Sequence, residues 1–123
     1  MKKIILLIVT LIGVMFWQSC QYEWFEPLEP ALPEEVSFTV DIVPLFNEGC
    51  NSSGCHSTGG IAPDLTAANA YSSLFALNLI NLTVPEESKL YTKCATDGSM
   101  NKYTQPGDPE MILQWIKQGA PNN

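Results

Sequence analysis

The sequence predicts an all-α fold. After residue 37, apolar residues recur at helical spacing in several segments, and capping or stop residues stand where each helix would begin and end. Apolar and polar residues almost nowhere alternate one by one, as they would in a half-buried strand. We therefore expect three to four helices joined by long loops.

The first expected helix lies in the segment DIVPLFNEG. Asp41 can cap its N-terminus, Pro44 fits its first turn, and Gly49 ends it just before Cys50. Its apolar face consists of Ile42, Val43 and Phe46.

Two further helices are expected in the middle of the chain. One follows Thr66, where the segment TAANAYSSLFAL has apolar residues at helical spacing. A short one follows Pro85, in the segment EESKLYTKC. The apolar positions of the longer helix are Ala70, Tyr71, Leu74 and Phe75.

The last expected helix has the clearest signals. Asp108 is its expected cap, Pro109 its first helical residue and Gly119 its stop. Two long loops, CNSSGCHSTGGIAPDL and CATDGSMNKYTQPG, then flank the middle helices. The buried stripe of the last helix is expected to consist of Ile112, Trp115 and Ile116.

The N-terminus has the pattern of an export signal, assigned to residues 1–19. Two lysines precede an apolar run from Ile4 to Trp17, which is shorter than the roughly 20 residues that a transmembrane helix needs. Cys20, at the expected cleavage point, resembles the acylated cysteine of bacterial lipoproteins. We therefore expect an extracytoplasmic protein, lipid-anchored to a bacterial membrane through Cys20. Ordinary signal cleavage, which leaves Cys20 as a free thiol, is the alternative.

Residues 20–36 are expected to form an acidic tether, and residues 37–123 one small domain. Pro27, Pro30 and Pro33 alternate with glutamates, which favours an extended, semi-rigid chain. The whole sequence has six basic and 13 acidic residues. Loss of Lys2 and Lys3 with the signal leaves four against 13, a net charge of −9, which argues against nucleic acid as a partner.

The segment CNSSGCHS, residues 50–57, contains two of the four cysteines and the only histidine of the chain. A haem-attachment motif has a histidine directly after its second cysteine but usually two residues between the cysteines. Here four residues separate them, so the extra ones would have to bulge outward. In an oxidising compartment Cys50 and Cys55 could instead form a disulfide beside an idle His56. A zinc site that adds Cys94 to these three residues is a further alternative, although ligands adjacent in sequence rarely both reach one tetrahedral ion.

Five segments stand in a particular order: SFTVDIVPLFNEGC, the Cys-Cys-His cluster, GGIAPDL, LY followed by GSM, and DPEMILQWIKQGAPNN. Together they resemble a small c-type cytochrome domain of bacterial exported proteins. The similarity spans nearly all of residues 37–123. It implies a cytochrome c-like domain of three to four helices around one covalently bound haem c.

The resemblance also implies which residues hold the haem. Cys50 and Cys55 would form the thioether bonds, and His56 would be the proximal iron ligand. The carbonyl oxygen of Pro63 would accept the hydrogen of His56 Nδ1 and so orient Nε2 toward the iron. Met100 would be the distal ligand.

Other residues have less specific expectations. Met111 lies near the edge of the buried stripe of the last helix, where core filling is its expected role. Cys94 is expected to be a reduced, partly buried thiol at the end of a short helix. A further set would either wall the haem or form an ordinary core: Phe46, Leu65, Tyr71, Leu74, Phe75, Tyr91 and Trp115.

The expected function is that of a membrane-tethered electron carrier without catalysis of its own. Its acidic surface suits a basic redox partner or a docking site within a larger membrane respiratory complex. The alternative is a haem-free lipoprotein module, closed by a disulfide, with a structural or interaction role.

Overall fold

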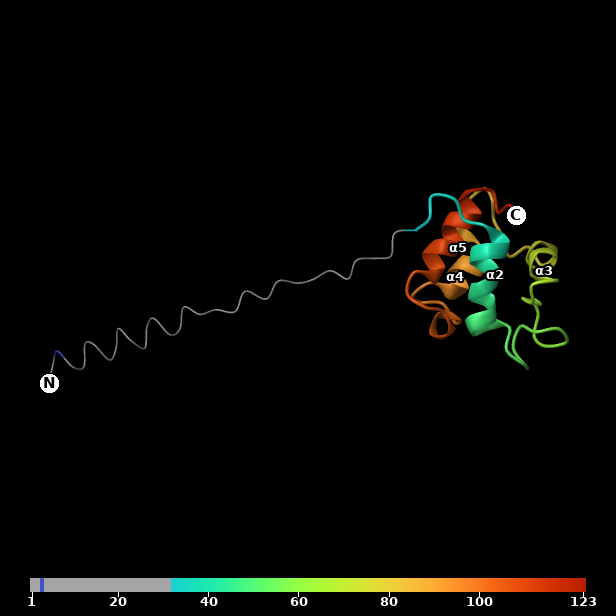
Figure 1. Ribbon diagram of the computed structural model, residues 1–123, viewed down its shortest axis with the longest axis horizontal. Helices are drawn as coiled ribbons and strands as arrows, with labels where there is room; N and C mark the ends of the chain where they lie inside the picture. Colours follow the sequence, from blue (N-terminus) through green and yellow to red (C-terminus); the bar gives the residue numbers. More distant parts are fainter. Residues whose placement is uncertain (1–2, 4–31) are drawn as a thin grey trace.

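The computed structural model describes Lys3 and residues 32–123 (Figure 1). The rest of the predicted signal peptide, Cys20 and the predicted tether up to residue 31 lie outside the described residues. Residues 32–123 contain helices and no strand, so the predicted all-α class is confirmed. Among the described helices, none combines the length and apolar character that a membrane span requires. The elements are η1 (Phe38–Ile42), α2 (Val43–Leu45), η2 (Phe46–Cys50), α3 (Ala70–Ala76), η3 (Pro85–Glu87), α4 (Lys89–Cys94), η4 (Asn101–Tyr103) and α5 (Asp108–Lys117).

η1, α2 and η2 run on as one helical segment that begins earlier than predicted. Ser37 caps it, since its Oγ accepts a hydrogen bond from the Val40 N–H at 3.3 Å. The predicted cap, Asp41, lies inside the first turn, where its carboxylate accepts the Ser37 N–H at 2.7 Å. Pro44 was predicted in the first turn but lies in the interior of the segment, flanked by the wide π-type turns η1 and η2. Because proline has no N–H to donate, the segment lacks one backbone hydrogen bond at Pro44.

Gly49 has a different role from the predicted stop. The segment ends at Cys50, and the Asn51 N–H donates to the Phe46 carbonyl oxygen at 2.9 Å. A Cβ atom on Gly49 would overlap the carbonyl oxygen of Tyr103. A glycine is therefore needed here so that η4 can pack closely against η2.

The other three predicted helices are confirmed. α3 matches the segment after Thr66, and η3 with α4 matches the segment after Pro85. α5 is capped by Gly107, one residue before the predicted Asp108. Gly119 ends α5 as predicted, with a φ of +91° that suits glycine. The N–H groups of Gly119 and Ala120 close the helix end by donating to the carbonyl oxygens of Ile116 and Trp115, each at 3.0 Å.

Several fully buried side chains lie where residues 36–38 meet the C-terminal segment. Trp115 is fully buried, and its ring centroid lies 5.1 Å from that of Phe38. The Asn123 side chain accepts the Phe38 N–H at 2.8 Å. The Gln118 side chain accepts the N–H of Val36 at 3.0 Å. Val36 is fully buried, so the packed domain takes in at least one residue of the segment predicted as tether. We call this region the packed end.

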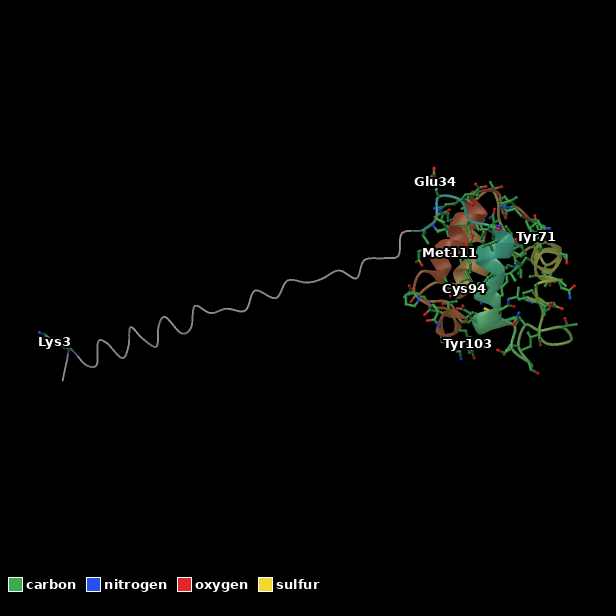
Figure 2. All side chains as sticks on the ribbon, in the orientation of Figure 1. Lys3, Glu34, Tyr71, Cys94, Tyr103 and Met111 are labelled. Atoms are coloured by element: carbon green, nitrogen blue, oxygen red, sulfur yellow. The ribbon has the colours of Figure 1, made fainter. Side chains whose placement is uncertain are left out.

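The opposite end of the domain contains the loop after Cys50 and the segment around η4. Figure 2 shows Glu34, beside the packed end, and Tyr103, on η4, at opposite sides of the domain. η2, the loop 51–65, Leu79, α4 and the segment 99–103 surround a cavity there. We call this region the cavity end.

Candidate functional site

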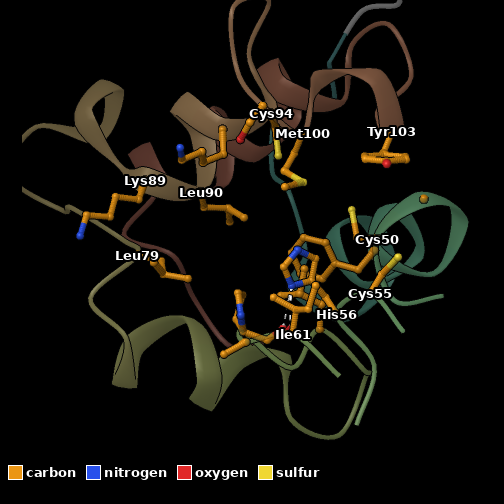
Figure 3. A pocket seen from close by; sticks show the side chains of 17 residues that line it. Cys50, Cys55, His56, Ile61, Leu79, Lys89, Leu90, Cys94, Met100 and Tyr103 are labelled. Carbon is orange, nitrogen blue, oxygen red and sulfur yellow. Dashed lines mark hydrogen bonds between the residues drawn. The ribbon is translucent and has the colours of Figure 1, made fainter. Parts of the chain in front are cut away.

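The cavity has a volume of about 470 Å³, within the range of roughly 300–1,000 Å³ typical of small-molecule and cofactor sites. Figure 3 shows its walls. All five residues that the sequence analysis assigned to haem binding line it, although they come from separate parts of the chain. Its complete lining is Phe46, Gly49, Cys50, Cys55, His56, Ile61, Ala62, Pro63, Leu65, Leu79, Lys89, Leu90, Lys93, Cys94, Ser99, Met100 and Tyr103.

The CNSSGCHS loop brings both of its cysteines to one side of the cavity. The His56 N–H donates to the Cys50 carbonyl oxygen at 3.1 Å, which closes the loop. The spacer turns outward: the Cys55 N–H donates to the Ser52 carbonyl oxygen at 2.9 Å, and Gly54 has a φ of +83°. Residues 52–54 are exposed. The longer spacer therefore projects into solvent and leaves the two thiols on the cavity wall.

The His56 imidazole is held by two backbone carbonyl oxygens. Its Nδ1 lies 3.0 Å from the oxygen of Ile61 and 3.1 Å from that of Pro63. Carbonyl oxygens only accept, so these contacts favour the tautomer with hydrogen on Nδ1. Nε2 then keeps its lone pair available for a metal ion or a donor. This is the contact between His56 and Pro63 that the resemblance implied.

Asp64 stabilises the backbone that presents the Pro63 carbonyl. Its carboxylate accepts hydrogen bonds from the hydroxyls of Thr66 at 2.6 Å and Thr58 at 2.9 Å, and from the Asn69 amide at 2.9 Å. It also accepts the Thr66 N–H at 3.0 Å. These hydrogen bonds, those of Thr66 first, lower the pKa of Asp64 to about 2. An ionised Asp64 thus anchors the turn next to the histidine contact.

The two candidate methionines have different surroundings. Met100 lines the cavity, and Figure 3 shows it projecting into the cavity across from His56. Its N–H donates to the Lys93 carbonyl oxygen at 2.8 Å, which fixes its segment against the end of α4. Met111 lies on α5, is partly buried against the core and does not line the cavity. Of the two, Met100 is therefore the one placed to reach a group bound in the cavity.

Cys50, Cys55 and Cys94, the three cysteines in the described residues, are all free thiols. Cys94 ends α4 and is 4% exposed, so it is more deeply buried than predicted. Burial, with the nearby Cys50 and Asp108, raises the pKa of its thiol to about 12. Burial also raises the pKa of Cys50, and Asp108 and Cys55 raise it further.

The disulfide and zinc alternatives have no counterpart within residues 32–123. Cys50 and Cys55 are not bonded to each other. In this part of the chain, no group of three or more His, Cys, Asp or Glu side chains is arranged to hold a metal ion. The four residues of the zinc alternative, Cys50, Cys55, His56 and Cys94, are therefore not arranged as a zinc site in the part of the chain that the structure describes.

Seven apolar residues were expected either to wall the haem or to form an ordinary core, and helical spacing could not distinguish the two roles. Phe46 and Leu65 line the cavity. The other five candidate wall residues do not: Tyr71, Leu74, Phe75, Tyr91 and Trp115.

Sequence reasoning missed several of the lining residues, including Leu79, Leu90 and Tyr103. It also missed Lys89 and Lys93. A signal for the lysines was present, because they are two of only four basic residues in the expected mature chain and lie four positions apart.

Comparison with known proteins gave no match: no family model, no curated protein and no solved structure is significantly similar to this chain.

Proposed function

We propose that the protein is a single-haem c-type cytochrome that carries electrons between extracytoplasmic redox partners. The proposal is supported mainly by one observation. Cys50, Cys55 and His56 line one apolar cavity together with Met100, although Met100 is far from them in sequence. The cavity is also of a size suited to a cofactor.

The residues around the cavity fit a haem c in donor set and in chemistry. Cys50 and Cys55 would hold it by thioether bonds, since both thiols are free and lie on the cavity wall. His56 would bind the iron through Nε2, which its Nδ1 contacts leave free. Met100 would be the second protein ligand of the iron. Haem held in this way would supply a reversible one-electron couple.

The side chains on the wall favour electron transfer over catalysis on a bound substrate. Phe46, Leu65 and Leu90 are buried and would exclude water from a bound group. With both His56 and Met100 as ligands, the iron would have no open position for a substrate. The chain would then exchange electrons with partners at the exposed rim of the cavity.

Covalent attachment is the decisive test. We expect protein made in a host with a cytochrome c maturation system to keep its haem after acid–acetone extraction. Its intact mass should be larger by one haem. Replacing Cys50 and Cys55 together by Ala should remove the covalent haem. Cys94→Ala is the matched control, because Cys94 also lines the cavity but has no proposed attachment role.

A folded wild-type protein without covalent haem, made under the same conditions, would overturn the proposal. So would covalent haem in the variant that lacks both Cys50 and Cys55. The first outcome would leave the haem-free lipoprotein module in its place.

We also propose that acyl chains on Cys20 tether the protein to the membrane. Several acyl chains anchor a protein stably, whereas one binds reversibly. The wild-type protein should therefore stay in the membrane fraction after a high-salt wash and need detergent for release. Cys20→Ser should move it to the soluble fraction. Wild-type protein in the soluble fraction would instead indicate ordinary signal cleavage.

A further inference from the structure

The charge on the cavity wall is opposite to that of the whole chain. The sequence has 13 acidic and six basic residues, yet no Asp or Glu lines the cavity. Two lysines do, Lys89 and Lys93. An acidic protein thus surrounds a cavity whose wall contains cationic lysines but no carboxylate side chain. A ligand with negative groups would suit it.

Lys89 and Lys93 stand on the same face of α4, which spans Lys89–Cys94. Residues four apart on an α-helix are neighbours, about 6 Å apart along the helix axis. Both lysines are exposed although they contribute to the cavity wall. Figure 3 shows Lys89 extending outward from the edge of the cavity. Their apolar stems can therefore cover the wall while their ammonium groups stay at its mouth.

Neither ammonium group is paired within the part of the chain that the structure describes. The ion pair there joins Lys117 to Glu86 at 2.8 Å and involves neither Lys89 nor Lys93. The two charges at the mouth are thus available to a ligand. Such a ligand would have an apolar body within the cavity and two anionic groups at its edge.

We propose that Lys89 and Lys93 bind the two propionate carboxylates of the haem. The inference rests on the proposed function and adds two positioning residues to it. The apolar wall receives the porphyrin, and the lysines neutralise its two carboxylates at the mouth. Positive charge at this position favours the reduced form of the haem, which carries one positive charge less than the oxidised form.

The first test uses the full chain made without haem. Metal-free protoporphyrin and its dimethyl ester differ only in two carboxylates, so the ratio of their affinities measures recognition of those groups. We expect the wild type to prefer the diacid by roughly three- to tenfold, as two exposed ion pairs would provide. The preference should disappear in the Lys89→Met, Lys93→Met double variant. It should persist when both lysines are replaced by Arg.

Lys117→Met is the matched control, because it removes the same charge from a site outside the cavity. It should keep the diacid preference. Equal affinities for diacid and ester in the wild type would overturn the inference, and so would a preference that survives in the double variant.

The second test uses the haem-loaded protein. The reduction potential should fall in the double Met variant and fall less in Lys117→Met. A double variant with covalent haem and a wild-type potential would overturn the inference while leaving the proposed function intact. Absence of covalent haem in the wild type would instead overturn the proposed function and the assignment of the lysines to its propionates.

Discussion

The two ends of the domain are built by different interactions. At the packed end, large side chains fill the interior, and the side chains of Gln118 and Asn123 bind the backbone of residues 34–38. At the cavity end, loops keep their shape through local hydrogen bonds around an open apolar space. The comparison indicates that stability depends mostly on the packed end. Side chains at the cavity end contribute less to stability and can therefore serve ligand binding.

The largest expected effect is at the packed end. Trp115→Ala removes a fully buried ring that contacts Phe38 and whose Nε1 donates to the Pro121 carbonyl oxygen at 2.9 Å. Replacement of a buried aromatic residue by Ala typically costs about 3–5 kcal/mol. The free energy of unfolding, measured by urea denaturation with far-ultraviolet circular dichroism, should fall by that amount.

Val40→Ala is the control, since Val40 lies in η1, as Phe38 does, but is 70% exposed. Exposed substitutions of this kind change stability by about 0.5 kcal/mol or less. A loss in Trp115→Ala as small as that in Val40→Ala would mean that the packed end does not dominate stability.

Variants of Met100 and Met111 distinguish a ligand role at the cavity end from a packing role against the core. In haem-loaded protein, Met100→Ala should erase the near-infrared sulfur-to-iron band, lower the reduction potential and permit carbon monoxide to bind the reduced form. Met111→Ala should keep the band and reduce stability by about 1 kcal/mol, because Met111 is only partly buried. Absorption spectra and urea denaturation would measure both effects. Loss of the band in Met111→Ala alone would reverse the ligand assignment.

We expect Asp64 to make the stability of the cavity end depend on pH. Its pKa is lowered from 3.8 to about 2, chiefly by hydrogen bonds from Thr66, so folding opposes its protonation. The stability that it contributes is therefore present above about pH 4 and is lost as the pH falls toward 2. Between about pH 5 and pH 2, the melting temperature of Asp64→Asn should change less than that of the wild type. Parallel curves would show that Asp64 does not stabilise the loop.

The smallest expected effect concerns the reactivity of Cys94. Because burial raises its pKa to about 12, little thiolate exists at pH 8. In haem-free native protein, a thiol reagent should modify Cys94 roughly tenfold more slowly than Cys55, which is only partly buried. After unfolding, the two should react at similar rates. Mass spectrometry of the modified peptides would measure this, and equal rates in the native protein would place Cys94 nearer the surface.

Local signals in the sequence were enough to predict the helices. The patterns of α3 and α5 depend on apolar spacing and stop residues within a few positions, which act on the chain before any distant contact forms. Gly119 ends α5 as predicted because a left-handed residue there is a local requirement. The predicted start of the first helix was wrong for a local reason as well. Ser37 and Asp41 cap it together, and only one of them was recognised.

The tertiary structure decided which residues share a site. The adjacency of Cys55 and His56 is visible in the sequence, but the entry of Met100 and the α4 lysines into the same cavity depends on how distant segments pack. Helical spacing shows that a face is apolar without showing what covers it. Trp115 and Tyr71 therefore could not be assigned to the core rather than the cavity. Gly49 was taken for a stop because its real constraint, the Tyr103 carbonyl, lies more than fifty residues away in the chain.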